Sequence, residues 1–251
     1  MSGASQGKIY LIGAGPGDPD LLTIKAARAL ALCDVILYDR LVGRDILSFA
    51  RPDAELIFVG KQAGEQDHKQ QQIFDLLAAK AQAGKIVGRL KGGDPLVFGR
   101  GAEEWALAVA LGIEVEFIPG ISSAVSVPGL AGVPLTFRGV SQSFVVVTGH
   151  CREGLEQDWT RFSRVDTLVI LMGVKNRVAI AQALIAAGRE QAEPVAFIRN
   201  GGRPEQETIE CTLGAVANGA VSVENPAVFV IGEVVGVAKM LRAKPAAIVS
   251  A

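Results

Sequence analysis

Near its N-terminus the chain reads Lys8-Ile9-Tyr10-Leu11-Ile12-Gly13-Ala14-Gly15-Pro16-Gly17-Asp18, an apolar run that passes directly into a loop of Gly, Pro and Asp. A short apolar run bounded by turn residues predicts a buried β-strand. Residues 21–32 are rich in Leu and Ala and predict a helix, with Asp20 as its N-cap. A strand, a glycine loop and a helix in this order are typical of an α/β fold.

The same alternation continues along the chain. We expect Gly84 and Gly112 to end two helices, and we expect ligands to bind beyond the carboxyl ends of the strands. The composition changes near residues 133–143, so the sequence predicts two α/β domains, at 1–134 and 135–251. The order of the strands cannot be read from the sequence. Strands are expected at 35–38, 55–59, 85–90, 114–118, 144–148, 167–171, 195–198, 208–212 and 227–231, and helices at 68–83, 100–111, 155–162 and 176–187, with a short helix after 119–123.

Composition excludes several classes of protein. Hydrophobic residues make up 49% of the 251 residues, which is enough for a sizeable core and argues against disorder. No run reaches the about 18 apolar residues of a spanning helix, and no apolar signal core is present, so we expect a cytoplasmic protein without a membrane partner. A net charge of −1 argues against a nucleic-acid partner. Cys33, Cys151 and Cys211 are widely spaced and only two histidines occur, so we expect buried thiols and no metal.

The first glycine loop partly matches a dinucleotide-binding fingerprint. Gly13 and Gly15 fit the pattern G-x-G-x-x-G, and Asp39 ends the second expected strand, where a ribose-binding acid would stand. However, Asp18 occupies the third glycine position, and its carboxylate would face a pyrophosphate at a helix N-terminus that attracts anions. Nicotinamide binding is therefore disfavoured.

A second loop carries a more specific pattern. Residues 89–104 read Arg89-Leu-Lys-Gly-Gly-Asp-Pro-Leu-Val-Phe-Gly-Arg-Gly-Ala-Glu-Glu104. This run resembles the hallmark of the uroporphyrinogen-III C-methyltransferases, a branch of the tetrapyrrole methyltransferases. The opening, residues 10–23, is similar to the opening of that family. Further matches follow in the expected order, so that the resemblance spans residues 8–241; they lie at 38–42, 59–61, 119–124, 133–138, 147–150 and 172–173.

The resemblance implies a reaction and an architecture. Two methyl groups would pass from two molecules of S-adenosylmethionine to C2 and C7 of uroporphyrinogen III, which gives precorrin-2 and S-adenosylhomocysteine. Precorrin-2 leads to sirohaem, cobalamin or haem d1. The implied fold is two α/β domains with the cofactor cleft between them, usually in a homodimer. Because no dehydrogenase or ferrochelatase domain precedes Lys8, we expect only the methylation step from this chain.

The resemblance also implies catalytic residues. Arg100 and Arg138, in loop or helix-start positions beyond expected strands, would be the substrate and catalytic arginines of a carboxylate-rich acceptor. Glu103 lies three residues after Arg100 and so shares a helix face with it. Arginine is always protonated, so Arg100 is interpreted as an electrostatic clamp. Asp39 and Lys61 would be proton acceptor and donor, with an arginine-orienting contact for Asp39 and carboxylate binding for Lys61 as alternatives.

Cofactor contacts follow from the same resemblance. The glycines of the second loop permit close backbone approach, and Asp94 can accept from a hydroxyl or ammonium group. The implied contacts are Pro16, Gly92, Gly93, Asp94, Val97, Ser122, Ser123, Met172 and Gly201.

Three other functions remain open at this point. The first is a sister enzyme that acts on a later corrin intermediate or on a non-tetrapyrrole substrate. The second is a nicotinamide-dependent oxidoreductase, and the third is a non-catalytic nucleoside-binding module.

Overall fold

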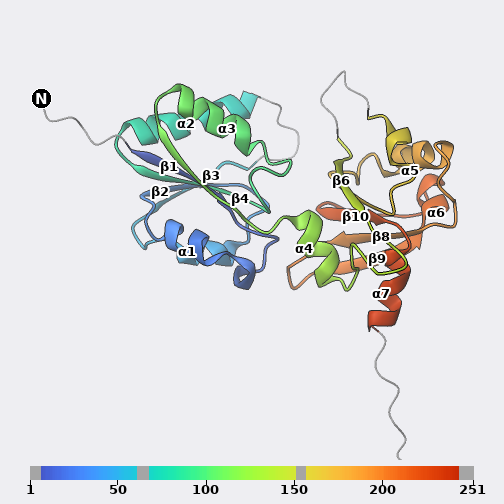
Figure 1. Ribbon diagram of the computed structural model, residues 1–251. Helices are drawn as coiled ribbons and strands as arrows, with labels where there is room; N and C mark the ends of the chain where they lie inside the picture. Colours follow the sequence, from blue (N-terminus) through green and yellow to red (C-terminus); the bar gives the residue numbers. More distant parts are fainter. Residues whose placement is uncertain (1–6, 61–67, 151–156, 243–251) are drawn as a thin grey trace, which may run out of the picture. The chain divides into compact units, whose positions relative to one another are not determined.

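The computed structural model describes residues 7–60, 68–150 and 157–242 (Figure 1). The chain divides into two compact units, Met1–Ser123 and Ala124–Ala251. This division falls earlier than the expected boundary after residue 134. The physical reason is that Ala124, Val127 and Val133 pack into the hydrophobic core of the second unit.

The first unit is a parallel sheet with helices on both faces. Its strand order is β3-β2-β4-β1-β5, and each neighbouring pair is parallel. Helix α1 packs on one face and α2 and α3 on the other (Figure 1). The strands are β1 (Lys8–Gly13), β2 (Val35–Tyr38), β3 (Glu55–Phe58), β4 (Ile86–Lys91) and β5 (Glu114–Ile118); the helices are η1 (Pro19–Leu21), α1 (Ile24–Leu30), η2 (Arg44–Phe49), α2 (His68–Gln82) and α3 (Gly101–Ala110).

The second unit is a mixed sheet in the order β6-β7-β10-β8-β9. Strands β6 and β7 are parallel, whereas β10 pairs antiparallel with β7 and β8, and β8 pairs antiparallel with β9. Helices α5 and α6 cover one face, and α4 and α7 cover the other. The strands are β6 (Phe144–Thr148), β7 (Thr167–Leu171), β8 (Pro194–Arg199), β9 (Glu207–Thr212) and β10 (Ala227–Ile231); the helices are α4 (Ser123–Leu130), η3 (Trp159–Phe162), α5 (Arg177–Ala186), α6 (Leu213–Ala217) and α7 (Val234–Arg242).

Some local expectations are wrong. Asp20 does not cap the first helix, because it lies inside η1; instead Thr23 Oγ1 accepts from the backbone N of Ala26 at 3.1 Å. Within the expected helix 155–162 the described residues form only the short 3₁₀ helix η3, and residues 155–156 lie outside the described part. Helices α6 and α7 were not expected.

The stretch 133–143, where the composition changes, contains an ordered turn. Phe137 and Ser141 form an isolated β-bridge across it, and the backbone N of Phe137 donates to Ser141 O at 3.1 Å. Ser141 Oγ lies 2.8 Å from Thr167 Oγ1 in the buried interior. The turn is therefore fixed to the second sheet.

The cysteines differ in their burial. Burial raises the pKa of Cys33 to about 12, as expected for a buried thiol. Cys211 is only half-buried, which corrects the expectation for that residue, and Cys151 lies outside the described residues. Among the helices that the structure describes, none is long and apolar enough to cross a bilayer.

Candidate active site

Four loops meet at the carboxyl edge of the first sheet, which is the edge where β1, β2, β4 and β5 end. Gly15 and Gly93 form a reciprocal backbone bridge, with N–O distances of 3.1 and 2.7 Å. A Cβ on Gly13 would lie 2.4 Å from the backbone N of Gly120. The loops after β1, β4 and β5 thus touch backbone to backbone, which requires glycine at the contact points.

Asp94 holds two of these loops together. Its Oδ1 accepts from the backbone N of Leu96 at 2.8 Å, and its Oδ2 accepts from the backbone N of Gly120 at 3.1 Å. A carboxylate offers about four acceptor positions, so Asp94 keeps capacity for a hydroxyl or ammonium donor of a ligand. The geometry fits the cofactor contact that we expect of Asp94, and it adds a role inside the chain itself.

The other expected cofactor residues of the first unit gather around this bridge. Gly93 has φ +68°, and a Cβ added to it would lie 3.6 Å from the backbone N of Ser123. Gly92 lies against the loop after β2, since a Cβ there would be 2.6 Å from Leu41 Cβ. The structure therefore brings one group together at the carboxyl edge, namely Pro16, Gly92, Gly93, Asp94, Ser122 and Ser123, with Val97 exposed on the same loop as Asp94.

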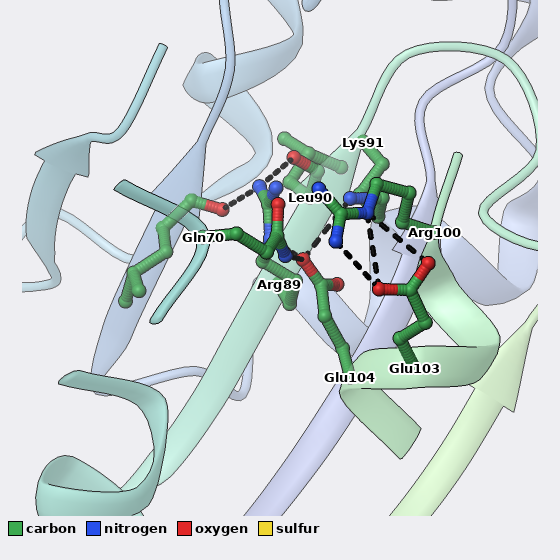
Figure 2. Close-up of polar contacts among 8 residues, drawn as sticks. Gln70, Arg89, Leu90, Lys91, Arg100, Glu103 and Glu104 are labelled. Atoms are coloured by element: carbon green, nitrogen blue, oxygen red, sulfur yellow. Dashed lines mark hydrogen bonds and ion pairs between the residues drawn. The ribbon is translucent and has the colours of Figure 1, made fainter. Parts of the chain in front are cut away.

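Arg100 and Glu103 form the expected pair on one face of α3 (Figure 2). Arg100 Nη2 lies 2.7 Å from Glu103 Oε2, and Arg100 Nε donates to both carboxylate oxygens at 3.1 Å. Both side chains are about half exposed, and such a pair contributes about 1 kcal/mol or less to stability. Arg100 also has φ +60°, and a non-glycine residue held in this region is characteristic of functional sites.

Of the two expected proton-transfer residues, the structure describes Asp39 and does not describe Lys61. Asp39 directly follows β2, is half-buried, and accepts from the backbone N of Leu41 at 2.9 Å through Oδ1. Lys61 lies outside the described residues.

A buried charged cluster beneath the carboxyl edge was not expected from the sequence (Figure 2). It consists of Arg89 and Lys91 on β4, Glu104 on α3 and the amide of Gln70 on α2. Glu104 Oε1 accepts from Arg89 Nε and from Lys91 Nζ, each at 3.1 Å. Gln70 Nε2 donates to the same oxygen at 3.2 Å. We call these four residues the Glu104 cluster.

The Glu104 cluster is almost fully enclosed. The side chains of Arg89, Lys91 and Glu104 are 4%, 7% and 2% exposed. Burial lowers the pKa of Lys91, the charge of Arg89 lowers it further, and the charges of Glu104 and Asp39 oppose this effect. One sequence signal could have revealed the cluster: Val87, Arg89 and Lys91 alternate along β4 and therefore share one face of the sheet.

The remaining site residues belong to the second unit. Arg138 is exposed in the turn between Phe137 and Ser141; it follows a helix and precedes β6, so the expected place beyond a strand is wrong. Met172 directly follows β7, is 48% exposed and has φ +56°. A Cβ on Gly201 would lie 2.3 Å from a methyl group of Val127, so only glycine fits there.

The chain is similar to known proteins over nearly its full length. The family model of the Tetrapyrrole (Corrin/Porphyrin) Methylases matches residues 8–217. The uroporphyrinogen-III C-methyltransferase of Priestia megaterium is 45% identical over 91% of this chain and 98% of its own length. The enzyme of that name from Methanocaldococcus jannaschii is 46% identical over 92% of this chain and 98% of its own length.

A solved structure gives the same result for the fold. Uroporphyrin-III C-methyl transferase from Thermus thermophilus, complexed with S-adenyl homocysteine, matches with a TM-score of 0.82 and 43% identity. The match covers 92% of this chain and 94% of that one. The two-sheet architecture of this chain is therefore that of a known methyltransferase.

Proposed function

We propose that this chain, which belongs to the tetrapyrrole (corrin/porphyrin) methylases, is an S-adenosylmethionine-dependent C-methyltransferase that converts uroporphyrinogen III to precorrin-2. One observation carries the proposal: identity of 45% with a uroporphyrinogen-III C-methyltransferase extends over 98% of that protein's length. When bound, S-adenosylmethionine supplies a methyl group on an electrophilic sulfonium. The methyl acceptors are C2 and C7 of the macrocycle.

The carboxyl edge fits the binding of such a cofactor. Gly92 and Gly93 present backbone without side chains, and Asp94 presents carboxylate oxygens to hydroxyl or ammonium donors. Pro16, Ser122, Ser123 and Val97 would complete the contacts from the first unit, and Met172 and Gly201 those from the second.

The charged residues suit a carboxylate-rich acceptor. Arg100 is held by Glu103 in one orientation, and a guanidinium binds a carboxylate through two parallel hydrogen bonds. Arg138 offers a second exposed guanidinium. Asp39 would accept the proton that leaves the macrocycle, and Lys61 would donate one. Positioning of the reactants contributes more than the base, since oriented reactants gain about 7–11 kcal/mol.

The assembly and location are part of this proposal. The family resemblance supports a homodimer in the cytoplasm. Light scattering on the purified chain, with a dimer mass expected, tests the assembly; a monomer that is fully active would contradict it.

Product analysis tests the proposed function. Uroporphyrinogen III and S-adenosylmethionine are incubated with the chain, and we expect a product with two added methyl groups and the visible spectrum of oxidised precorrin-2. An unmodified substrate, together with methylation of a later corrin intermediate, would instead indicate a sister enzyme. Thermal unfolding adds a test of class: S-adenosylhomocysteine should raise the Tm and NAD should not. The reverse result would indicate an oxidoreductase.

Arg100→Ala tests the substrate clamp. We expect turnover to be abolished while the Kd for S-adenosylhomocysteine changes by less than about twofold, because the arginine acts on the acceptor. The matched control is Arg51→Ala, which removes an exposed arginine paired with Asp53 at 2.6 Å and should leave turnover unchanged. Loss of both turnover and cofactor binding in Arg100→Ala would place Arg100 in the cofactor site or in the fold instead.

A further inference from the structure

The Glu104 cluster carries more positive than negative charge. Within the described part of the chain, Glu104 is the one carboxylate bonded to the two buried cations, and its Oε1 accepts from both of them. Among the residues that the structure describes, no group donates to its buried Oε2. Buried ions are stable when each is paired, so an extra buried cation is a cost to the fold. A cluster that served stability alone would not need Lys91.

The sheet register brings the end of β2, which Asp39 follows directly, next to the end of β4 at Lys91. In the parallel pair of β2 and β4, Leu37 lies opposite Arg89 and Tyr38 opposite Leu90. Because side chains alternate between the faces of a sheet, the residues that follow, Asp39 and Lys91, share the face of Arg89. Arg89 confirms the contact of these strands on that side, since its Nη1 donates to Leu37 O at 3.4 Å.

Among the described residues, the charges that act on Lys91 come from three elements. Arg89 lies on the same strand, Glu104 contacts Lys91 from α3, and Asp39 acts on it from the end of β2. The charge of Asp39 raises the pKa of Lys91 against the opposing effects of burial and Arg89, which is consistent with an attraction between the two side chains.

We propose that Lys91 is a positioning residue for Asp39: its ammonium, anchored by Glu104, attracts the carboxylate at the end of β2 and holds it where it accepts the proton released by the acceptor. This inference rests on the proposed function. When an acceptor carbon gains the methyl group, the macrocycle acquires one positive charge. Loss of one proton to the Asp39 carboxylate then restores neutrality. Lys91 itself stays protonated and does not contact the acceptor.

The test is Lys91→Met, which leaves Arg89 and Glu104 as a one-to-one pair. We expect kcat to fall about tenfold or more, a part of the typical contribution of a general base. The KM for uroporphyrinogen III and the Kd for S-adenosylhomocysteine should change by less than about twofold, and the Tm should stay equal or rise. Lys80→Met is the matched control, because Lys80 is also paired with one glutamate, Glu55, but on the surface; it should leave kcat unchanged.

Lys91→Gln separates charge from hydrogen bonding. Its amide still donates to Glu104 but carries no charge, so we expect the same loss of kcat as in Lys91→Met. Wild-type kcat in Lys91→Gln would overturn the proposal that the charge is what acts.

A double-mutant cycle shows whether Lys91 acts through Asp39. In an Asp39→Asn background, Lys91→Met should lower kcat by less than about twofold further, since the carboxylate it positions is already absent. An equal loss in both backgrounds would overturn the proposal, and so would a lower Tm joined to weaker binding of S-adenosylhomocysteine, which indicates a structural role. The wild type is assayed first. If it yields no methylated product, the proposed function itself fails. If the wild type is active and Lys91→Met is equally active, only this inference is rejected.

Discussion

Each unit of the molecule buries charged side chains, and the two arrangements differ in their balance. In the second unit Arg189 pairs with Glu193, and both oxygens of the Glu193 carboxylate accept hydrogen bonds from the Arg189 guanidinium. Arg189 Nη1 also donates to the carbonyl oxygens of Phe162 and Val165, at 2.7 and 2.9 Å. In the first unit Arg89 and Lys91 share one oxygen of Glu104.

This difference separates a structural role from a functional one. The pair of Arg189 and Glu193 has one charge of each sign and ties η3 to the segment before β8, as a structural link should. The Glu104 cluster has a surplus cation and lies directly below the glycine loop at Gly92. Ionisable groups that are buried without balance are concentrated at functional sites. Charge balance therefore indicates which buried group serves the reaction.

The largest expected effect is that of Glu104→Gln. It removes the carboxylate from between two buried cations, and we expect a loss of about 3–5 kcal/mol in the free energy of unfolding together with a fall in turnover. The measurement is denaturant unfolding at neutral pH beside a methylation assay. Glu103→Gln is the control for stability, because it breaks only the exposed pair with Arg100. This change should lower the free energy of unfolding by about 1 kcal/mol or less. An unchanged stability of Glu104→Gln would show that Glu104 does not anchor the cluster.

A smaller effect is expected for Arg189→Met. It leaves the Glu193 carboxylate and two carbonyls without their donor, and we expect a loss of about 3 kcal/mol, at the low end for a broken buried pair because Glu193 is 14% exposed and can turn toward water. Turnover per folded molecule, measured well below the Tm, should equal that of the wild type. If turnover falls as well, the two regions do not differ in the way that their charge balance indicates.

The smallest effect is a change in the pH dependence of stability. The pKa of Lys91 in the folded protein lies below its ordinary value of 10.5, mainly because of burial. Between those two pKa values the unfolded chain holds the proton and the folded protein does not, so the contribution of Lys91 to stability rises as pH rises through this window. Urea unfolding from pH 7 to 10.5 should show this relative gain in the wild type and not in Lys91→Met. Parallel curves for the two proteins would contradict it.

The strands could be predicted closely from the sequence. Val35–Tyr38, Glu114–Ile118 and Thr167–Leu171 have the expected bounds. The first and third are short, mostly apolar runs, and Glu114–Ile118 alternates charged and apolar residues between Gly112 and Pro119. Helix α7 was missed, since Val234–Arg242 continues the apolar run that begins with β10 and shows no separate start. Strand order depends on pairing between distant residues, which local patterns do not record.

The site was predictable in part for a similar reason. Arg100 and Glu103 are neighbours along one helix, so their spacing alone predicts their contact. Glu104 stands in the same quoted run, but its partners Arg89 and Lys91 contact it only because α3 folds back over β4. The bridge between Gly15 and Gly93 likewise requires that β1 and β4 be neighbours.

Hydrogen exchange with and without S-adenosylhomocysteine tests most directly whether the carboxyl edge of the first sheet is the methyl-transfer site. We predict that the ligand protects the backbone amides of residues 92–97 and 120–123, with further protection near Met172 and Gly201. Residues 186–193, which include the balanced pair of the second unit, should exchange at an unchanged rate. Binding of the ligand without protection at residues 92–97 would contradict the account.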